Sequence, residues 1–541
     1  MPVKCSAFAG ERSFVLNKLN CDVLVLGGGL AGLSAAKAAV ENGSNIILAS
    51  NGEKASPHVI GYSVPISNED SPEFFAADIR SAGRNLNSPF LVKAFTEKAK
   101  DLPEWLKKQG VLFDEKDGQY QLMRSLGHST ARLVHHATAT GAETLLLLQK
   151  QIQSSSATIL NQHKCLFIVN ESDTVCGAIL LDTQSKELIG IETKAIVLAT
   201  GGCHVTGRST YPSEQFGDGY ALAYNAGATL VDMEFIQHEP LRSVVMPVGL
   251  STTMLAKGGK LLNNEGERFV LKEYDNEGVP TKDKLAQLIC AEVQQGKGTE
   301  HRGVYADMTG LSEEAFTQHQ AIYDRFYQRG IDLKKDMVEV APAAHSIMGG
   351  VLIDENASTG VTGLYAAGEV AGGLHGASRL GGNAGTETIV FGKIAGENAA
   401  RFAKEANQTH SKAFEEYEKW LARLLKKNVY VHDFSILQKY TYSTMENGMG
   451  PVRNEKDLKE TSEKLETYAS TMRETGIASI DQLEAFSSVS NLLLTCRLAC
   501  LAATNRKESR GAHARSDFPT ELDIIYHIRF DKRNGMRIEQ E

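Results

Sequence analysis

The segment spanning residues 21–50 constrains the fold more than any other part of the chain. It contains an apolar run over 22–26, the glycine pattern Gly27-x-Gly29-x-x-Gly32, an Ala-rich run over 33–41 and a second apolar run over 45–49. This order predicts a strand, a tight turn, a helix and a second strand. The glycines permit the turn, and the N-terminus of the helix offers free N–H groups and a positive dipole end to a pyrophosphate. The pattern therefore predicts a dinucleotide-binding βαβ unit.

Ser50 leaves the identity of the dinucleotide open. The second strand of such a unit usually ends in an acidic residue that binds a ribose hydroxyl. Here the corresponding residue is Ser50. The residues themselves therefore indicate a dinucleotide without indicating which one.

The composition is that of an ordinary globular protein too long for a single core. The chain has 541 residues, of which 42% are hydrophobic and 23% charged, and its formal net charge is −9. This mild acidity disfavours a nucleic-acid partner or an anionic membrane surface. We find no long apolar run and no signal peptide, so we expect no membrane span in this chain and a cytoplasmic location, membrane-peripheral only through a partner. The eight cysteines lack CxxC spacing, so we expect no zinc site or iron–sulfur cluster in the chain itself.

The α/β pattern is interrupted once and is then followed by a charged helical region. Helices are expected over 71–110 and 132–153, whereas residues 238–342 show short strands, turns and two helices. We predict an α/β fold with three parts. A Rossmann-like domain over 1–237 and 343–407 is interrupted by an α+β domain over 238–342 and followed by a C-terminal helical domain and tail over 408–541.

Further motifs occur in a fixed order along the chain. After the glycine pattern come Ala199-Thr-Gly-Gly202, Gly217-Asp-Gly219, His345-x-x-Met-Gly-Gly350, Leu364-Tyr-Ala-Ala-Gly-Glu369, Leu374-His-Gly-Ala-Ser-Arg-Leu-Gly-Gly-Asn383 and Arg506-Lys-Glu-Ser-Arg-Gly-Ala-His513. Over roughly residues 21–520 the chain resembles the flavoprotein family of succinate dehydrogenase, fumarate reductase and L-aspartate oxidase. The resemblance implies an FAD domain, a mobile capping domain and a C-terminal helical domain. It also implies FAD as the cofactor, with electrons exchanged through a separate iron–sulfur protein subunit, through oxygen or through a soluble carrier.

The resemblance extends the FAD site beyond the glycine turn and Ser50. It places Ala199, Gly201 and Asp218 at the cofactor, and Glu369 is positioned to bind ribityl hydroxyls. Small residues surround Asn383, so the backbone can approach the flavin ring, and the helix that follows would direct its dipole at the ring.

The position of Ser50 also identifies the residue to which the flavin could be covalently attached. In the succinate dehydrogenase type, the histidine that bonds covalently to the flavin lies eight residues beyond the equivalent serine, which is His58 here. L-Aspartate oxidase binds FAD noncovalently and has no histidine there. The alternative is a loop histidine that only stacks or forms a hydrogen bond near the flavin.

Three candidate substrate residues follow from the resemblance. Arg379 matches the arginine that clamps a substrate carboxylate, and His345 matches a histidine that binds the same substrate. Lys282 stands where fumarate-active relatives have their proton-shuttle arginine. Lysine as a residue type transfers a proton more readily than arginine, but it lacks the planar fork that binds a carboxylate in a bidentate manner. The alternatives are a structural salt bridge for Arg379, a satisfied loop histidine for His345, and a solvated lysine in a repurposed cap for Lys282.

Two family motifs in the capping domain are altered. The Thr-Glu-x-x-Arg-Gly stretch that relays protons corresponds to residues 251–256, which contain no ionisable group. The motif Gln-x-His-Pro becomes Gln237-His-Glu-Pro240, so the histidine is either shifted to His238 or replaced by Glu239.

We therefore interpret the chain as a FAD-dependent oxidoreductase that carries out two-electron CH–CH or C=C chemistry on a small carboxylate substrate. The altered relay leaves open whether that substrate is fumarate, succinate or another carboxylate. L-Aspartate oxidase is the alternative enzyme. A non-catalytic or electron-relaying flavoprotein subunit is the alternative from another class.

Overall fold

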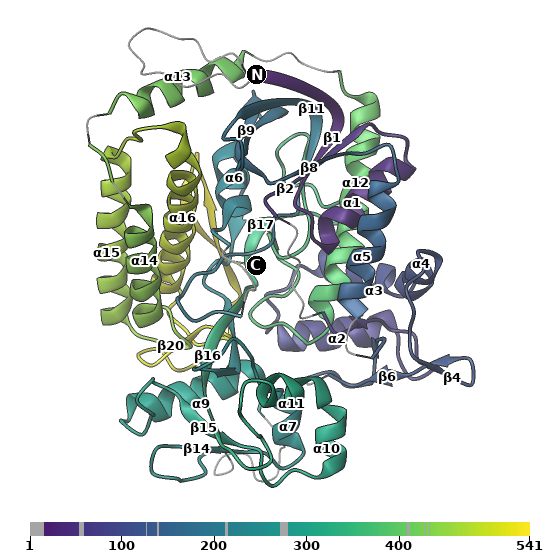
Figure 1. Ribbon diagram of the computed structural model, residues 1–541, viewed down its shortest axis with the longest axis vertical. Helices are drawn as coiled ribbons and strands as arrows, with labels where there is room; N and C mark the ends of the chain where they lie inside the picture. Colours follow the sequence, from purple (N-terminus) through teal and green to yellow (C-terminus); the bar gives the residue numbers. More distant parts are fainter. Residues whose placement is uncertain are drawn as a thin grey trace.

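The structure is a computed structural model that describes residues 16–52, 59–125, 127–137, 140–210, 215–270, 280–407, 412–427, 429–431 and 433–540 (Figure 1). His58, the proposed attachment point, lies outside the described residues.

A mixed sheet forms the centre of the nucleotide-binding region. Its strands are, in order, β8 (Thr158–Asn161), β2 (Ile46–Ser50), β1 (Asn17–Leu26), β11 (Leu188–Leu198), β10 (Thr174–Asp182) and β9 (His163–Glu171), and β18 (Leu364–Ala366) pairs with β11. The strands from β8 to β11 run parallel, as does β18, whereas β10 runs antiparallel to both of its neighbours, β11 and β9. Val23, Leu24 and Val25 of β1 are completely buried, as expected for a parallel strand covered on both faces.

Two helices that carry cofactor motifs pack closely against each other. They are α1 (Leu30–Glu41), which follows the glycine turn, and α12 (Asn383–Glu405), and both lie with α5 (Thr140–Gln153) on the right of Figure 1. A Cβ atom on Gly392 would lie 2.5 Å from the carbonyl oxygen of Ala31, and one on Gly396 would lie 2.1 Å from that of Ala35. These glycines therefore let the backbone of α12 approach α1.

Serine caps begin two of the helices that follow the first βαβ unit. Ser71 and Ser88 accept hydrogen bonds from backbone N–H groups of the first turn, and each is followed by proline. The elements here are α2 (Pro72–Ala82), α3 (Pro89–Ala99), α4 (Leu102–Lys108), β3 (Tyr62–Ser63), β4 (Glu115–Lys116), β5 (Gln119–Tyr120), β6 (Leu122–Met123) and β7 (Leu133–Val134). The prediction of one helix over 132–153 is wrong at its start. There Leu133 and Val134 pair with β3 and β6, and α5 begins only at Thr140.

The inserted region has its own sheet and its own core (Figure 1, bottom). Its strands are, in order, β13 (Ile236–Ser243), β16 (Val338–Ile347), β15 (Val304–Asp307) and β14 (Lys260–Leu262), and its helices are α7 (Thr252–Ala256), α9 (Lys282–Gln294), α10 (Glu313–Gln318) and α11 (Gln320–Tyr327). Met254, Leu285 and Phe326 are completely buried within it. The boundaries proposed at 237/238 and 342/343 fall within β13 and β16, which pair with each other.

The C-terminal helices stand beside the main sheet and end in a hairpin that returns to the nucleotide-binding region. They are α13 (Ala413–Leu425), α14 (Phe434–Gly448), α15 (Glu455–Glu474), the 3₁₀ turn η1 (Ile480–Gln482) and α16 (Leu483–Asn505), with β20 (Val452–Arg453) pairing with β21 (Ala514–Arg515). The polar tail expected at the end is ordered as β22 (Tyr526–Asp531) and β23 (Gly535–Gln540). It joins β12 (Leu230–Val231), β17 (Gly350–Leu352) and β19 (Ala371–Gly372) in a five-stranded sheet.

One segment in the described part of the chain, Ile480–Asn505, is long and apolar enough to cross a membrane by length and composition. In the structure 61% of its apolar window is buried inside the molecule. That burial is typical of a core helix.

Buried charges tie the Arg506–His513 motif to the nucleotide-binding region. The completely buried guanidinium of Arg506 bonds to Asp232 at 3.2 Å and to Glu508 at 2.9 Å, and it also pairs with Glu234. The three carboxylates satisfy the donors of a charge that would be very costly to bury alone. The motif therefore joins the C-terminal helices to the turn between β12 and β13, which leads into the inserted region.

Candidate functional site

A cavity of about 1850 Å³ runs from the glycine turn to the inserted region. It is lined by the N-terminal ends of α1 and α12, the ends of β2 and β11, and residues of β13, β16, α7 and α9. Its location at the carboxyl ends of the parallel strands is where nucleotides bind in open α/β sheets.

The glycine turn leaves room where a pyrophosphate would lie. A Cβ atom on Gly27 would lie 2.1 Å from the carbonyl oxygen of Ala199, and one on Gly32 would lie 1.8 Å from that of Gly27. Gly27 also has φ +123°, which favours glycine. A Cβ on Gly29, in contrast, would meet no protein atom within 4 Å, and no side chain caps α1. The first turn of α1 therefore keeps N–H donors directed at open space.

The residues expected at the other end of the dinucleotide lie along the same cavity. Ser50 ends β2 with its hydroxyl 3.5 Å from Oδ1 of Asn161, and Ala199 and Gly201 follow β11. Asp218 begins α6 (Asp218–Ala226), and its carboxylate accepts hydrogen bonds from Lys164 at 2.6 Å and from Asn491 at 2.7 Å. Asp218 thus joins the cavity wall to α16.

The N-terminus of α12 provides a second group of unused polar atoms. Gly382 precedes the helix with φ +84°, and Oδ1 of the buried Asn383 has no hydrogen-bond partner within the described structure. The same holds for the hydroxyl of Thr200, near the other end of the cavity. Glu369 lines the cavity and accepts a bond from the N–H of Ile347 at 3.3 Å. These orphaned atoms and the open turn at Gly29 fit a dinucleotide cofactor.

The proposed carboxylate clamp, Arg379, is oriented by an amide. Its guanidinium donates to Oε1 of Gln237 at 3.1 and 3.3 Å, and the side chain of Gln237 donates back to the carbonyl oxygen of Arg379 at 3.0 Å. The described residues place no carboxylate in an ion pair with Arg379. The guanidinium therefore keeps its charge available to a ligand in the cavity.

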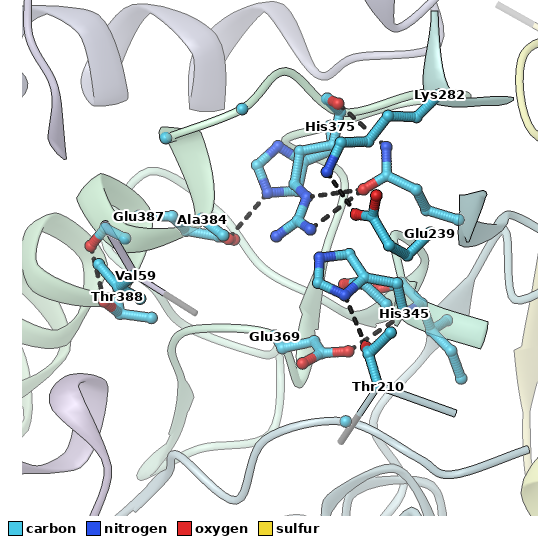
Figure 2. A pocket seen from close by; sticks show the side chains of 18 of the residues that line it. Val59, Thr210, Glu239, Lys282, His345, Glu369, His375, Ala384, Glu387 and Thr388 are labelled. Carbon is cyan, nitrogen blue, oxygen red and sulfur yellow. Dashed lines mark hydrogen bonds and ion pairs between the residues drawn. The ribbon is translucent and has the colours of Figure 1, made fainter. Parts of the chain in front are cut away.

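Lys282 and Glu239 point toward each other across the cavity (Figure 2). Nζ of Lys282 donates to Oε2 of Glu239 at 2.5 Å, with 34% of the lysine side chain exposed and 16% of the glutamate side chain. His345 lies close by and is oriented by Thr210, whose hydroxyl is 2.7 Å from its Nδ1 (Figure 2). Lys282, Glu239, Arg379 and His345 therefore line one end of the cavity.

Strand alternation separates the two residues of the altered motif, His238 and Glu239. Gln237 and Glu239 face the cavity, whereas His238 is buried and is absent from the cavity lining. Burial lowers the pKa of His238 to about 3, with the nearby charge of Arg453 adding to the effect. Glu239 is therefore the residue that this motif presents to the cavity, and His238 packs away from it.

Three residues that the sequence analysis did not assign to the site lie at the cavity. Nε2 of His375 is 2.8 Å from Oε2 of Glu387, and both side chains are buried beside the start of α12 (Figure 2). Asp283 is also buried, and it accepts a hydrogen bond from the hydroxyl of Ser378. Burial raises the pKa of Asp283 to about 6. His375 stands in a motif that the sequence analysis quoted, but its partner is 12 residues away and nothing local identifies the pair.

The motif Gly127-His128-Ser129 supports the start of α12. Nε2 of His128 is 2.8 Å from the carbonyl oxygen of Gly381, and its Nδ1 is 3.2 Å from the guanidinium of Arg132. Because the guanidinium can only donate, Nδ1 accepts and Nε2 donates. Burial lowers the pKa of His128 to about 4, so the ring is a neutral support for the Gly381–Gly382 turn.

The altered relay stretch forms the short helix α7. Ser251 caps it, and the hydroxyl of Thr253 is 2.7 Å from Nε2 of His319 in the cavity wall.

The described part of the chain brings no three His, Cys, Asp or Glu side chains together as a metal site.

Comparisons with known proteins agree with this arrangement. A family model described as FAD binding domain matches residues 22–384, and one described as Fumarate reductase flavoprotein C-term matches residues 439–539. The chain is 32% identical to one subunit of the fumarate reductase (CoM/CoB) of Methanothermobacter marburgensis, over 92% of this chain and 94% of that one. It is 31% identical to the L-aspartate oxidase of Acinetobacter baylyi, over 92% of this chain and 93% of the relative.

A solved structure shows the same likeness. A variant of the E. coli quinol fumarate reductase FrdA superposes with a TM-score of 0.90, with 26% sequence identity and 97% of each chain covered. The α/β fold predicted from the sequence, with its inserted and C-terminal helical regions, is thereby confirmed.

Proposed function

The chain belongs to the family of FAD-dependent oxidoreductases that includes fumarate reductase flavoproteins and L-aspartate oxidases, and we propose that it acts on a carbon–carbon bond of a small carboxylate substrate. FAD, when bound, supplies a reversible two-electron acceptor and donor in the form of a hydride equivalent. The remaining chemistry belongs to the side chains of the protein.

We assign the cofactor site to the residues that leave room or orphaned polar atoms along the cavity. These are Gly27, Gly29, Gly32, Ser50, Ala199, Gly201, Asp218, Glu369, Arg379 and Asn383. The first turn of α1 would bind the pyrophosphate, because its donors face open space. The N-terminus of α12 would lie at the ring, where its dipole stabilises negative charge.

The observation that carries the proposal is the Lys282–Glu239 pair, which lies beside Arg379 and His345 in one cavity. Arg379 carries the charge and planar fork that bind a carboxylate, and Gln237 fixes its orientation. His345, held by Thr210, adds a second polar contact. Lys282 would deliver a proton to the reacting carbon, or remove one from it, and Glu239 would hold its ammonium in place.

The experiment is a turnover assay on the FAD-loaded protein. Reduced methyl viologen supplies electrons, fumarate is the first probe, and other unsaturated carboxylates follow. We expect Lys282→Ala to lower turnover by about 10²–10⁴-fold, the range typical of a lost general acid. Unchanged turnover in this variant would exclude Lys282 as the proton shuttle.

L-Aspartate oxidase is the second candidate, and its support is the 31% identity with the enzyme of A. baylyi. Lys282 and Glu239 depart from the family motifs on either reading, so an assay must separate the two activities. Release of hydrogen peroxide on addition of L-aspartate in air, without fumarate reduction, would establish this activity in place of the first.

We further propose that electrons pass between the flavin and a separate iron–sulfur protein subunit. The relative from M. marburgensis is named as one subunit of its enzyme. Affinity purification from the native host, followed by iron and sulfide analysis, tests the partner. A stable complex with no turnover on any carboxylate or amino acid would instead establish a non-catalytic, electron-relaying subunit.

A further inference from the structure

A buried histidine–glutamate pair at the start of α12 has no part in the proposed reaction. Nε2 of His375 lies 2.8 Å from Oε2 of Glu387, and the two side chains are only 7% and 4% exposed. Both residues line the cavity, and Figure 2 shows their contact beside Ala384. A buried ionisable pair in the wall of a cofactor cavity is a candidate for a functional role.

The carboxylate of Glu387 belongs to the end of α12 that we assign to the flavin ring. Glu387 stands four residues after Asn383, which begins the helix, and a helical side chain leans toward the N-terminus of its own helix. The positive end of the helix dipole stabilises an ionised carboxylate there. Glu387 therefore carries a negative charge close to the place where a reduced flavin would gain one.

The tyrosines around this end of α12 stay neutral. Burial raises the pKa of Tyr62 of β3, Tyr220 of α6 and Tyr365 of β18 above its ordinary value. At Tyr220 the charges of Glu369 and Glu387 add to the effect of burial. None of these three phenols can therefore change its charge near neutral pH.

The other ionisable groups around the pair leave the imidazole of His375 as the group that can change its charge. His128, which supports Gly381, is kept neutral by burial, and Arg379 is a fixed cation bonded to Gln237. The charged side chains of α3 and α4, which also pack against α12, are exposed. Those of α1, β1 and β11 form ion pairs: Lys37 with Glu41, Lys18 with Glu192 and Asp22 with Lys194.

From this arrangement we propose that the His375–Glu387 pair takes up one proton when the bound flavin is reduced. Two electrons and one proton go to the flavin, and a second proton is added at Nδ1 of His375, because Nε2 donates to the ionised carboxylate. Histidine is the residue type that changes its charge between about pH 5 and pH 8. The net charge at this end of the cavity then stays the same, since the new imidazolium balances the charge that the ring gains. The inference rests on the placement of the ring at the start of α12 and holds for any substrate.

The test is the midpoint potential of the FAD-loaded protein between about pH 6 and pH 8, measured without substrate by reduction with dithionite beside reference dyes. In a two-electron reduction, each proton taken up changes the equilibrium tenfold per pH unit, which is about 30 mV. The wild type should take up two protons, so its potential should fall by about 60 mV per pH unit. Glu387→Gln and His375→Gln should each take up one proton and show a fall of about 30 mV per pH unit.

The matched control is Glu143→Gln, which breaks a contact of the same kind outside the cavity lining. Nδ1 of His136 lies 2.7 Å from Oε2 of Glu143 in the first turn of α5, and both side chains are partly exposed. This variant should keep the pH dependence of the wild type. Bound flavin and the unfolding temperature confirm that each variant is folded.

Two results would overturn the inference. One is a fall of about 60 mV per pH unit that persists in Glu387→Gln or in His375→Gln, because the second proton would then be held elsewhere. The other is a fall of only about 30 mV per pH unit in the wild type, which needs no variant. Neither result bears on turnover, since no substrate is present, so the proposed function would still stand or fall by the viologen assay.

Discussion

Nζ of Lys282, at the start of α9, lies 2.5 Å from Oε2 of Glu239 on β13, and these residues are 43 positions apart in the chain. The pair brings an acidic and a basic side chain together beside Arg379 and His345. Both residues stand in stretches that the sequence analysis found to differ from the motifs of the family it resembles, and the structure pairs them with each other.

We predict that Lys282 and Glu239 act as a unit. Lys282→Gln and Glu239→Gln should each lower turnover, because the first removes the proton donor and the second removes the charge that holds it. The double variant should be little worse than the poorer single variant, because groups that act together are not additive. The coupling between the two residues is measured by the turnover of the wild type, the two single variants and the double variant, with a carboxylate substrate identified in the viologen assay. Effects that multiply in the double variant would show that the two residues act independently.

The outcome at this site shows what the sequence can and cannot predict. The altered motif left His238 and Glu239 as alternatives, and only strand alternation resolved them, since one residue faces the cavity and the other is buried. Arg242 also lines this cavity, and its place there could not be predicted, because it depends on an irregularity in the pairing of β13 with β16. Pairs such as Lys282 with Glu239 or His375 with Glu387 join separate elements, and no local pattern encodes them.

The βαβ unit, in contrast, was predictable because its signals are local. The glycine turn, the Ala-rich helix and the two apolar runs lie within 30 consecutive residues, and the structure places β1, α1 and β2 over them. The start of α5 was not predictable in this way, since residues 133–134 join a small sheet with partners from β3 and β6.

We predict opposite phenotypes for two alanine substitutions in the glycine turn. Gly32→Ala should disrupt folding, because its Cβ would lie 1.8 Å from the carbonyl oxygen of Gly27. Gly29→Ala meets no protein atom within 4 Å and should fold, but it should weaken FAD binding by about 10-fold or more, because the methyl group occupies space next to the first-turn donors. FAD titration of apoprotein and its unfolding temperature separate the two effects.

Gly310→Ala is the control for both variants, because it also meets no protein atom within 4 Å and lies in the inserted region. It should change neither FAD affinity nor unfolding. If FAD affinity were unaffected in Gly29→Ala, the pyrophosphate would not lie at the N-terminus of α1.

The buried network around Arg506 predicts a large loss of stability on truncation. Arg506→Met leaves the carboxylates of Asp232, Glu234 and Glu508 without their shared cation, and breaking a buried pair of this kind typically costs about 3–5 kcal/mol. The exposed Arg533 also pairs with a carboxylate, Asp173, so Arg533→Met is the matched control and should change the stability little, because solvent screens a surface pair. Thermal unfolding of the two variants measures the contrast. Equal losses would show that the network contributes no more than a surface pair.

Covalent attachment of FAD at His58 stays a prediction. The expected result is that protein precipitated with acid keeps its flavin absorbance and that its mass exceeds that of the bare chain by one flavin. His58→Ala should lose both signals while still binding FAD noncovalently, because the glycine turn and α12 are unchanged. Colourless precipitate from the wild type, with no added mass, would assign His58 to the loop-histidine alternative.

The raised pKa of the buried Asp283 predicts that the stability of the protein depends on pH. Burial raises its pKa from the ordinary range to about 6, so the folded protein retains a proton that the unfolded chain releases at lower pH. The folded state therefore binds more protons between about pH 4 and pH 6, and the contribution of Asp283 to stability is largest below this range and is lost as the pH rises through it. Asp283→Asn mimics the protonated form and does not lose this contribution. The difference in the free energy of unfolding between this variant and the wild type should therefore increase by about 1–3 kcal/mol from pH 5 to pH 8, and the variant's unfolding temperature should rise relative to that of the wild type.

Asp523→Asn, at an exposed aspartate, is the control, and its difference from wild type should stay constant between the two pH values. Thermal unfolding of all three proteins in the same buffers gives the comparison. A constant difference for Asp283→Asn as well would mean that the carboxyl group is already ionised at pH 5 in the folded protein. The hydrogen bond from the hydroxyl of Ser378, which joins the nucleotide-binding region to α9, would then stabilise the ionised carboxylate more than burial destabilises it.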